Sequence, residues 1–174
     1  MSMTPEFSRP VKADQVKRLT GDTHIAADAA EREALARRFG LSALDRLEAD
    51  YTLTEENGAI MARGRVRAAL AQPCVATGVP VPETIDTDFV LRFVVEGEGT
   101  PEAEELELDA EDCDTIGYDG QVVDMGETVA ETMALALIPF PRAPDADAYL
   151  KEAGVLSEEQ ASPFAALLGL KDRK

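Results

Sequence analysis

Apolar and polar residues alternate along three successive stretches of the chain, residues 47–54, 60–70 and 84–95. A period of two is typical of β-strands that bury one face and expose the other. Asn57-Gly58 lies between the first two stretches, and this dipeptide is a strong signal for a tight hairpin turn. The pattern therefore predicts a three-stranded antiparallel meander.

The hairpin also predicts a register for its two strands. With Asn57-Gly58 as a two-residue turn, Leu53 lies opposite Ala62 on the apolar face. On the polar face the same register sets acidic or hydroxyl side chains against arginines, in the pairs Thr52–Arg63, Asp50–Arg65 and Glu48–Arg67. Both faces make chemical sense in this one register, which supports it.

A helix is predicted for residues 28–40, where alanine dominates. Asp28 can cap its start, Glu31 stands at the position that completes a capping box, and Gly40 can end it. A shorter helical turn is expected over residues 42–46.

A second helix is predicted for residues 126–137, where Val129, Met133 and Leu137 form an apolar stripe. We expect this helix and the one containing Glu31 to cover the sheet. The predicted fold class is α+β, with a small twisted antiparallel sheet that can curl toward a partial barrel.

With 174 residues, the chain has the size of one domain, and we interpret residues 1–174 as a single domain. Residues 96–105 are rich in Gly, Pro and Glu and predict a solvated acidic loop. Residues 157–170 predict a short C-terminal helical tail. No apolar run reaches the roughly 18 residues of a membrane span, and the first residues do not resemble a signal peptide. We therefore expect a cytoplasmic protein.

The net charge of −17 is concentrated in one part of the chain. Residues 93–141 carry 14 acidic residues and no Lys or Arg, whereas residues 1–92 and 142–174 have net charges of only −2 and −1. Such a field repels the phosphates of nucleic acids and attracts basic proteins. The candidate partner-binding residues in this block are Glu104, Glu105, Glu107, Asp109, Glu111, Asp112 and Asp114.

Arginines supply the candidate nucleic-acid contacts. Arg63, Arg65 and Arg67 share one face of a predicted strand, and Arg37 and Arg38 lie near the end of the first helix. A basic stripe of this kind can bind phosphates. The alternative, which the predicted register favours, is a solvated sheet face whose arginines are balanced by acids on adjacent strands, namely Glu48, Asp50, Asp86 and Asp88.

Residues for catalysis or metal binding are few. Cys74 lies at a strand-to-loop corner, and Thr77 stands where the second thiol of a Cys-x-x-Cys pair would be. Zinc needs further thiol or imidazole ligands, but His24 is the sole histidine and Cys113 lies among acids. We interpret Cys74 as a buried corner residue and His24 as part of a surface loop. We predict no catalytic residue, metal or cofactor, and no enzyme activity.

Six segments in order resemble the YceD-like family of large ribosomal RNA subunit accumulation proteins, in its alphaproteobacterial form. They are residues 7–11 (FSRPV), 31–40 (EREALARRFG), 72–77 (QPCVAT), 123–131 (VDMGETVAE), 139–144 (PFPRAP) and 163–167 (PFAAL). The resemblance covers nearly the whole chain. In many relatives the corner carries Cys-x-x-Cys, so Cys74 stands for the remnant of a pair and no zinc site is carried over.

The resemblance implies a non-enzymatic ribosome-biogenesis factor that supports synthesis, processing or stability of large-subunit ribosomal RNA. Its expected partner is a precursor of the large subunit, contacted through the RNA or through a basic ribosomal protein. The alternative is a general protein-interaction or chaperone-like module that binds a basic protein through its acidic region. A metal-dependent enzyme is the third hypothesis, and it requires bound metal in the purified protein. Neither a membrane nor a small-molecule substrate is expected.

Overall fold

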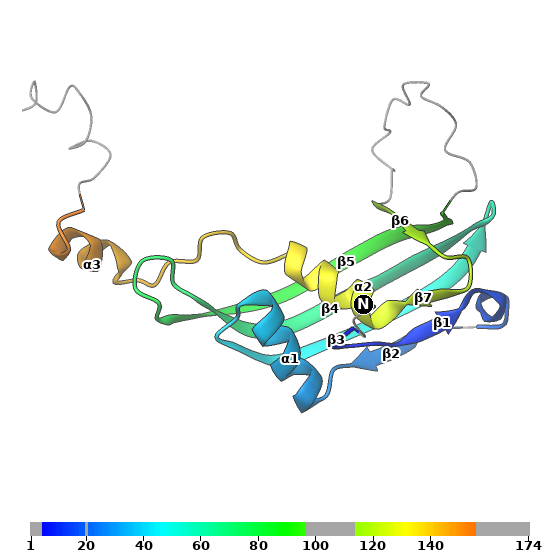
Figure 1. Ribbon diagram of the computed structural model, residues 1–174, viewed down its shortest axis with the longest axis horizontal. Coiled ribbons are helices and arrows are strands. Elements are labelled where there is room, and N and C mark those ends of the chain that lie inside the picture. The colour runs from blue at the N-terminus through cyan, green and yellow to red at the C-terminus, as the bar shows by residue number, and fades with distance from the viewer. Residues whose placement is uncertain (1–4, 20, 97–113, 156–174) are drawn as a thin grey trace, which may run out of the picture. The chain divides into compact units, whose positions relative to one another are not determined.

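The computed structural model describes residues 5–19, 21–96 and 114–155 (Figure 1). Its strands are β1 (Pro10–Lys12), β2 (Thr23–Ala26), β3 (Ala43–Glu56), β4 (Ala59–Pro73), β5 (Pro80–Val95), β6 (Asp114–Tyr118) and β7 (Val122–Asp124). Its helices are the 3-10 helix η1 (Ala13–Arg18) and the α-helices α1 (Ala29–Phe39), α2 (Met125–Leu135) and α3 (Ala146–Glu152). The predicted tail at residues 157–170 lies outside the described residues, as does most of the predicted acidic loop.

The chain divides into two compact units. Residues up to Gln72 and residues Pro82–Ile138 form the first, and Pro73–Val81 with the residues from Pro139 onward form the second. The first unit holds a sheet in the order β2-β3-β4-β5-β6 and a small antiparallel pair of β1 and β7. The larger sheet is open among the described residues, with β2 and β6 at its edges, and it does not close into a barrel.

The predicted hairpin is confirmed in position and register. β3 and β4 are antiparallel, with Leu53 opposite Ala62 and Asp50 opposite Arg65. Asn57 and Gly58 have positive φ angles of 51° and 78°, as a two-residue turn of this kind requires. β5 is β4's other neighbour, and the six residues that join them are too few for a parallel crossover, so the predicted meander is confirmed too.

Two local predictions are wrong. Residues 42–46 are not helical, because β3 begins at Ala43 and the Ser42 N–H donates to the Ala71 carbonyl at 2.8 Å. β6 is parallel to β5, pairing along Leu91–Val95, so the sheet is mixed and not wholly antiparallel.

The first helix has the predicted ends. The Asp28 side chain and Glu31 form a reciprocal capping box at the start of α1, and Gly40 ends it in the left-handed conformation with φ of 66°. The second predicted helix is α2, which ends at Leu135, two residues earlier than expected.

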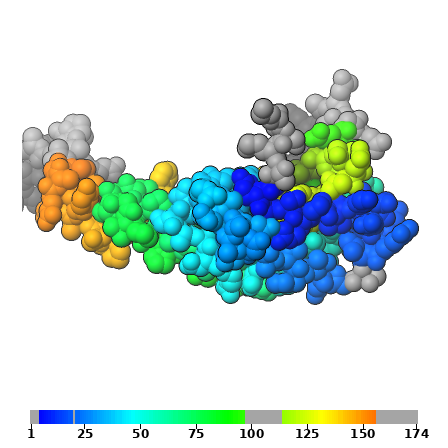
Figure 2. All heavy atoms as spheres, turned by 60° about the horizontal axis from the view of Figure 1, so that its bottom comes forward, coloured from blue at the N-terminus to red at the C-terminus, as the bar shows by residue number. Residues whose placement is uncertain are grey.

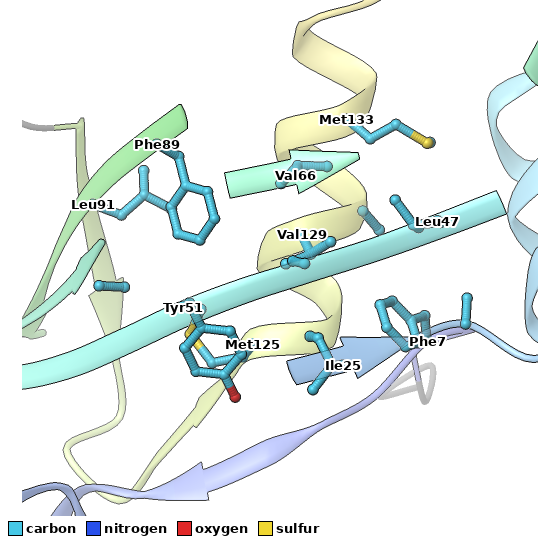
Figure 3. Close-up of a cluster of buried hydrophobic side chains, with 14 of the residues drawn as sticks. Phe7, Ile25, Leu47, Tyr51, Val66, Phe89, Leu91, Met125, Val129 and Met133 are labelled. Atoms are coloured by element: carbon cyan, nitrogen blue, oxygen red, sulfur yellow. The ribbon is translucent and has the colours of Figure 1, made fainter. Parts of the chain in front are cut away.

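The core lies between the apolar face of the sheet and α2. Figure 3 shows Met125, Val129 and Met133 of α2 pointing toward side chains of the strands, among them Leu47 and Val66. All five of these side chains are essentially inaccessible to solvent. Leu137, predicted as the third member of the stripe, is half-buried beyond the helix end.

The second unit is built around the corner at Cys74. The Cys74 N–H donates to the Val79 carbonyl and the Gly78 N–H donates to the Cys74 carbonyl, both at 2.8 Å. The Val75 N–H donates to the Pro141 carbonyl at 3.0 Å. Cys74 packs with Ala143 and Ala146 of this unit. Residues Ala146–Glu152 of this unit form the helix α3.

Candidate functional site

The three arginines of β4 are held by carboxylates of neighbouring strands. Their shortest ion pairs are Arg63–Glu56 at 2.7 Å, Arg65–Asp86 at 2.5 Å and Arg67–Asp50 at 2.8 Å. Arg65 also lies 3.4 Å from Asp88, and Arg67 lies 3.7 Å from Glu48. All four predicted balancing acids are therefore in place.

Ion pairing lowers the pKa values of Glu56 and Asp86. The Arg63 guanidinium holds the pKa of Glu56 at about 2, and Arg65 lowers the pKa of Asp86. The carboxylates are therefore fully ionised at neutral pH, and the arginine donors are directed to them. This arrangement favours the balanced sheet face over a phosphate-binding stripe.

The partner of Asp50 differs from the simple cross-strand expectation. Arg65 lies opposite Asp50 in the register, yet its side chain reaches β5, and Asp50 pairs with Arg67 instead. Long side chains reach such diagonal neighbours across a sheet. Asp50 also contacts His24 Nδ1 at 2.7 Å. The hydrogen bond with His24 is the main cause that lowers the pKa of Asp50, and the hydrogen bond with Arg67 is the second.

His24 is exposed, as predicted, but it does not lie in a loop. It belongs to β2, where it stands opposite Asp50 of β3. The four-residue strand is too short to show alternation in the sequence, which explains why it was missed. Among the described residues no group of three His, Cys, Asp or Glu side chains could hold a metal ion.

The arginines at the end of α1 have different surroundings. Arg37 pairs with Glu33 one turn earlier at 2.6 Å, and both side chains are mostly exposed. Arg38 pairs with Glu127 at 2.6 Å and with Glu6 at 2.9 Å. Arg38 thus joins α1 to α2 and to the N-terminal segment, which gives it a structural role.

Asp114 is the one predicted partner-binding acid among the described residues, and it begins β6 with an exposed side chain. The other predicted acids, from Glu104 to Asp112, lie outside the described residues, as does Cys113.

The N-terminal segment and the start of α2 form a network that sequence reasoning did not predict. Asp124 Oδ1 accepts from the N–H groups of Arg9 at 2.7 Å and Gly126 at 3.0 Å, and Oδ2 accepts from Ser8 Oγ at 2.5 Å. An added Cβ at Gly126 would collide with the Phe7 carbonyl and lie 2.9 Å from the Arg9 nitrogen. Figure 2 shows the N-terminal residues in dark blue against yellow-green residues that precede α2. The cap signal of an Asp before a helix could have indicated Asp124.

A second link runs from the same segment to α1. The Arg9 guanidinium donates to both carboxylate oxygens of Glu31, at 2.7 and 2.9 Å, and to the Ala26 carbonyl at 3.1 Å. It also lies 4.6 Å from the centre of the Phe7 ring. Arg9 lowers the pKa of Glu31. Two motif segments, residues 7–11 and 123–131, are thus explained by packing and hydrogen bonding.

Cys74 is buried, and its thiol has an unusual set of donors. The Ala143 N–H donates to Sγ at 3.2 Å. This hydrogen bond is the main cause that lowers the pKa of the thiol from 9.0 to about 7, and a hydrogen bond from the Thr77 side chain is the second. The position of Thr77 beside the sulfur agrees with the predicted remnant of a Cys-x-x-Cys turn.

A shallow groove of about 370 Å³ lies between the edge of the sheet and α2 in the first unit. Thr87–Leu91 of β5 and Asp114 of β6 form one side, and Thr132, Leu135 and Ala136 form the other. Among the described residues, its lining contains two carboxylates and no basic side chain. Sequence reasoning did not find this groove, because it depends on where β6 begins relative to β5.

Comparison with known proteins gives one family. The family model described as "Large ribosomal RNA subunit accumulation protein YceD" matches residues 62–171. A search of curated proteins and a search of solved structures gave no significant match. None of the helices among the described residues is long and apolar enough to cross a membrane.

Proposed function

Because the chain belongs to the YceD family of large ribosomal RNA subunit accumulation proteins, we propose that it is a non-enzymatic ribosome-biogenesis factor of the cytoplasm. In this proposal it supports the synthesis, processing or stability of large-subunit ribosomal RNA. It does so by binding a basic protein of the large-subunit precursor, and its contact with the RNA is indirect.

The observation that carries this proposal is the pairing of the β4 arginines. Arg63, Arg65 and Arg67 each have a carboxylate within 2.8 Å. A phosphate that bound there would have to displace a carboxylate from each guanidinium and would meet the repulsion of those carboxylates. Direct RNA binding through this face is therefore disfavoured.

The distribution of charge supports a basic partner. Residues 93–141 carry 14 acids and no Lys or Arg, and the exposed Asp114 belongs to this block. Proteins that bind ribosomal RNA are themselves basic, because they neutralise phosphates. An acidic surface is complementary to such a protein before it reaches the RNA.

The first test is the ratio of large- to small-subunit ribosomal RNA in a strain that lacks this gene. We expect the ratio to fall and to be restored by the wild-type gene. An unchanged ratio would contradict the proposed function and favour a general protein-interaction module.

Rescue by variants separates the two routes of contact. Neutralisation of Glu104, Glu105 and Glu107 to Gln should reduce rescue if a basic protein is the partner. If RNA is contacted directly, reversal of Arg65 and Arg67 to Glu should reduce rescue more than neutralisation of the acidic residues does. Variant protein levels serve as the control, because loss of the ion pairs on the sheet can also lower stability.

A further inference from the structure

β5 has an open edge over much of its length. β6 pairs only with Leu91–Val95, and β4 occupies the other side of β5. Among the described residues, the part of β5 from Pro82 to Val90 therefore has no strand beside it on the β6 side. Unpaired strand edges are the surfaces to which extended segments of other proteins add as a further strand.

The prolines of β5 indicate which of its backbone groups point outward. Proline has no N–H, and within sheets its nitrogen faces away from the neighbouring strand. Pro80 and Pro82 therefore place the even-numbered backbone groups of β5 on the open side. Since backbone N–H and C=O groups alternate between the two sides of a strand, those of Thr84, Asp86, Asp88 and Val90 point outward.

The groove described above borders this edge. Apolar surface is exposed there, because Leu135 at the end of α2 is 85% exposed and Val90 is 41% exposed. Asp88 and Asp114 add two carboxylates to the same groove. The Asp88 side chain is 75% exposed, and its contact with Arg65 is a long one, at 3.4 Å. The site thus combines free main-chain groups, apolar surface and negative charge.

We propose that this open edge binds an extended segment of a partner protein in which basic and apolar residues alternate. The segment adds to β5 as a strand through main-chain hydrogen bonds. Its apolar side chains lie on the α2 face of the sheet and cover Leu135 and Ala136, and its Lys or Arg side chains lie on the opposite face, where they approach Asp88. This inference rests on the proposed function, and it adds which kind of segment of the basic partner binds and where.

The charge of the edge disfavours other occupants. A second copy of this chain, paired edge to edge, would bring Asp86 and Asp88 of both copies together, and like charges across a strand pair are destabilising. Residues 97–113 of the same chain carry eight acids and no Lys or Arg, so the same repulsion applies to them. RNA phosphates would meet Asp88 and Asp114.

The test uses the full-length protein and a fluorescent peptide of about eight alternating Lys and Val residues, the length of an ordinary strand. Binding is measured by fluorescence anisotropy at low salt. A peptide of alternating Glu and Val controls for charge. A Lys-Val peptide with methyl groups on alternate backbone nitrogens controls for main-chain hydrogen bonding.

Binding should weaken about tenfold with the N-methylated peptide, which cannot donate its full set of strand hydrogen bonds, and should be lost with the Glu-Val peptide. The substitution Asp88→Asn should weaken binding about two- to fivefold. Asp22→Asn is the matched control, because Asp22 is exposed and adjoins β2 at the opposite edge of the sheet. It should leave the affinity unchanged.

Val90→Pro removes one outward N–H, because proline has none. β5 already contains a proline at Pro82, so this variant should weaken binding without unfolding the protein. Circular dichroism checks folding, and the N-methylated peptide tests the same point on the wild-type protein if the variant does not fold.

The proposal would be overturned if the methylated and unmethylated peptides bound equally well. It would also be overturned if Asp22→Asn weakened binding as much as the substitution of Asp88 does. Direct binding of a labelled RNA oligonucleotide to the protein that Val90→Pro weakens would overturn it too, as would a dimer that Val90→Pro converts to monomer. The ribosomal RNA ratio is measured separately. Peptide binding at the edge with a normal ratio would refute the proposed function alone, and a lowered ratio without edge binding would refute this inference alone.

Discussion

Substitution of Asp124 tests whether the network at the start of α2 holds the first unit together. Its carboxylate accepts from Ser8 Oγ and from the N–H groups of Arg9, Gly126 and Glu127, the last at 3.3 Å. Loss of an N-cap typically costs about 1 kcal/mol, and hydrogen bonds to a charged acceptor contribute about 1.5–3 kcal/mol each. The network is only half-buried and its bonds are not additive, so we expect Asp124→Ala to lower the free energy of unfolding by about 2–4 kcal/mol.

Urea and thermal unfolding followed by circular dichroism measure this loss. For a chain of this size it corresponds to a fall in Tm of about 5–15 °C. Asp124→Asn should cost less than half as much, because Asn caps helices as well as Asp and retains an acceptor oxygen. Asp119→Ala is a matched control. Its carboxylate also accepts two backbone N–H groups, from Gln121 at 2.8 Å and Val122 at 3.1 Å, but in an exposed turn.

The network would not be the main link between the N-terminal segment and α2 if Asp124→Ala cost under 1 kcal/mol. Equal losses for Asp124→Ala and Asp119→Ala would lead to the same conclusion. Equal losses for Asp124→Ala and Asp124→Asn would show that the negative charge, and not the acceptor geometry, is what the site requires.

Three further predictions concern packing and titration. Gly126→Ala should destabilise the protein by about 1–3 kcal/mol in urea unfolding, because the added methyl group overpacks a filled site; an unchanged midpoint would contradict this. In a Cys113→Ser background, the ultraviolet absorbance of the Cys74 thiolate should rise with pH around a midpoint of about 7, and a midpoint near 9 would contradict the lowered pKa. The pKa of Glu56 is lowered from 4.5 to about 2, so its pair with Arg63 contributes stability that is complete above about pH 4.5 and lost as the pH falls toward 2. The stability difference between the wild type and Arg63→Gln should therefore shrink over that range, and a constant difference would contradict the pairing.

The central hairpin was predictable because each of its signals is local. The turn at Asn57-Gly58 fixes the register, and the long alternating strands decide which face is buried. The first helix was predictable for the same reason, since Asp28, Glu31 and Gly40 act within a few residues of one another.

The missed elements depend on contacts that are distant in sequence. β2 is four residues long, and β1 and β7 have three residues each, so none shows a usable period. They exist because β1 pairs with β7 and β2 pairs with β3. The predicted arginine face was placed correctly on β4, but its exact ion pairs follow from side-chain reach across three strands, which a register alone does not give.

Three of the segments in which the sequence resembles the family are occupied by the fold. Ser8 and Arg9 bind Asp124, Glu31 binds Arg9, and Glu127 binds Arg38. A side chain committed in this way is not available to a partner without loss of stability, so these segments belong to the scaffold of the first unit. Among the described residues of the first unit, the surfaces that we propose for recognition are the acidic start of β6 and the open edge of β5. Both carry negative charge, which is why the proposal names a basic protein and not RNA as the direct contact.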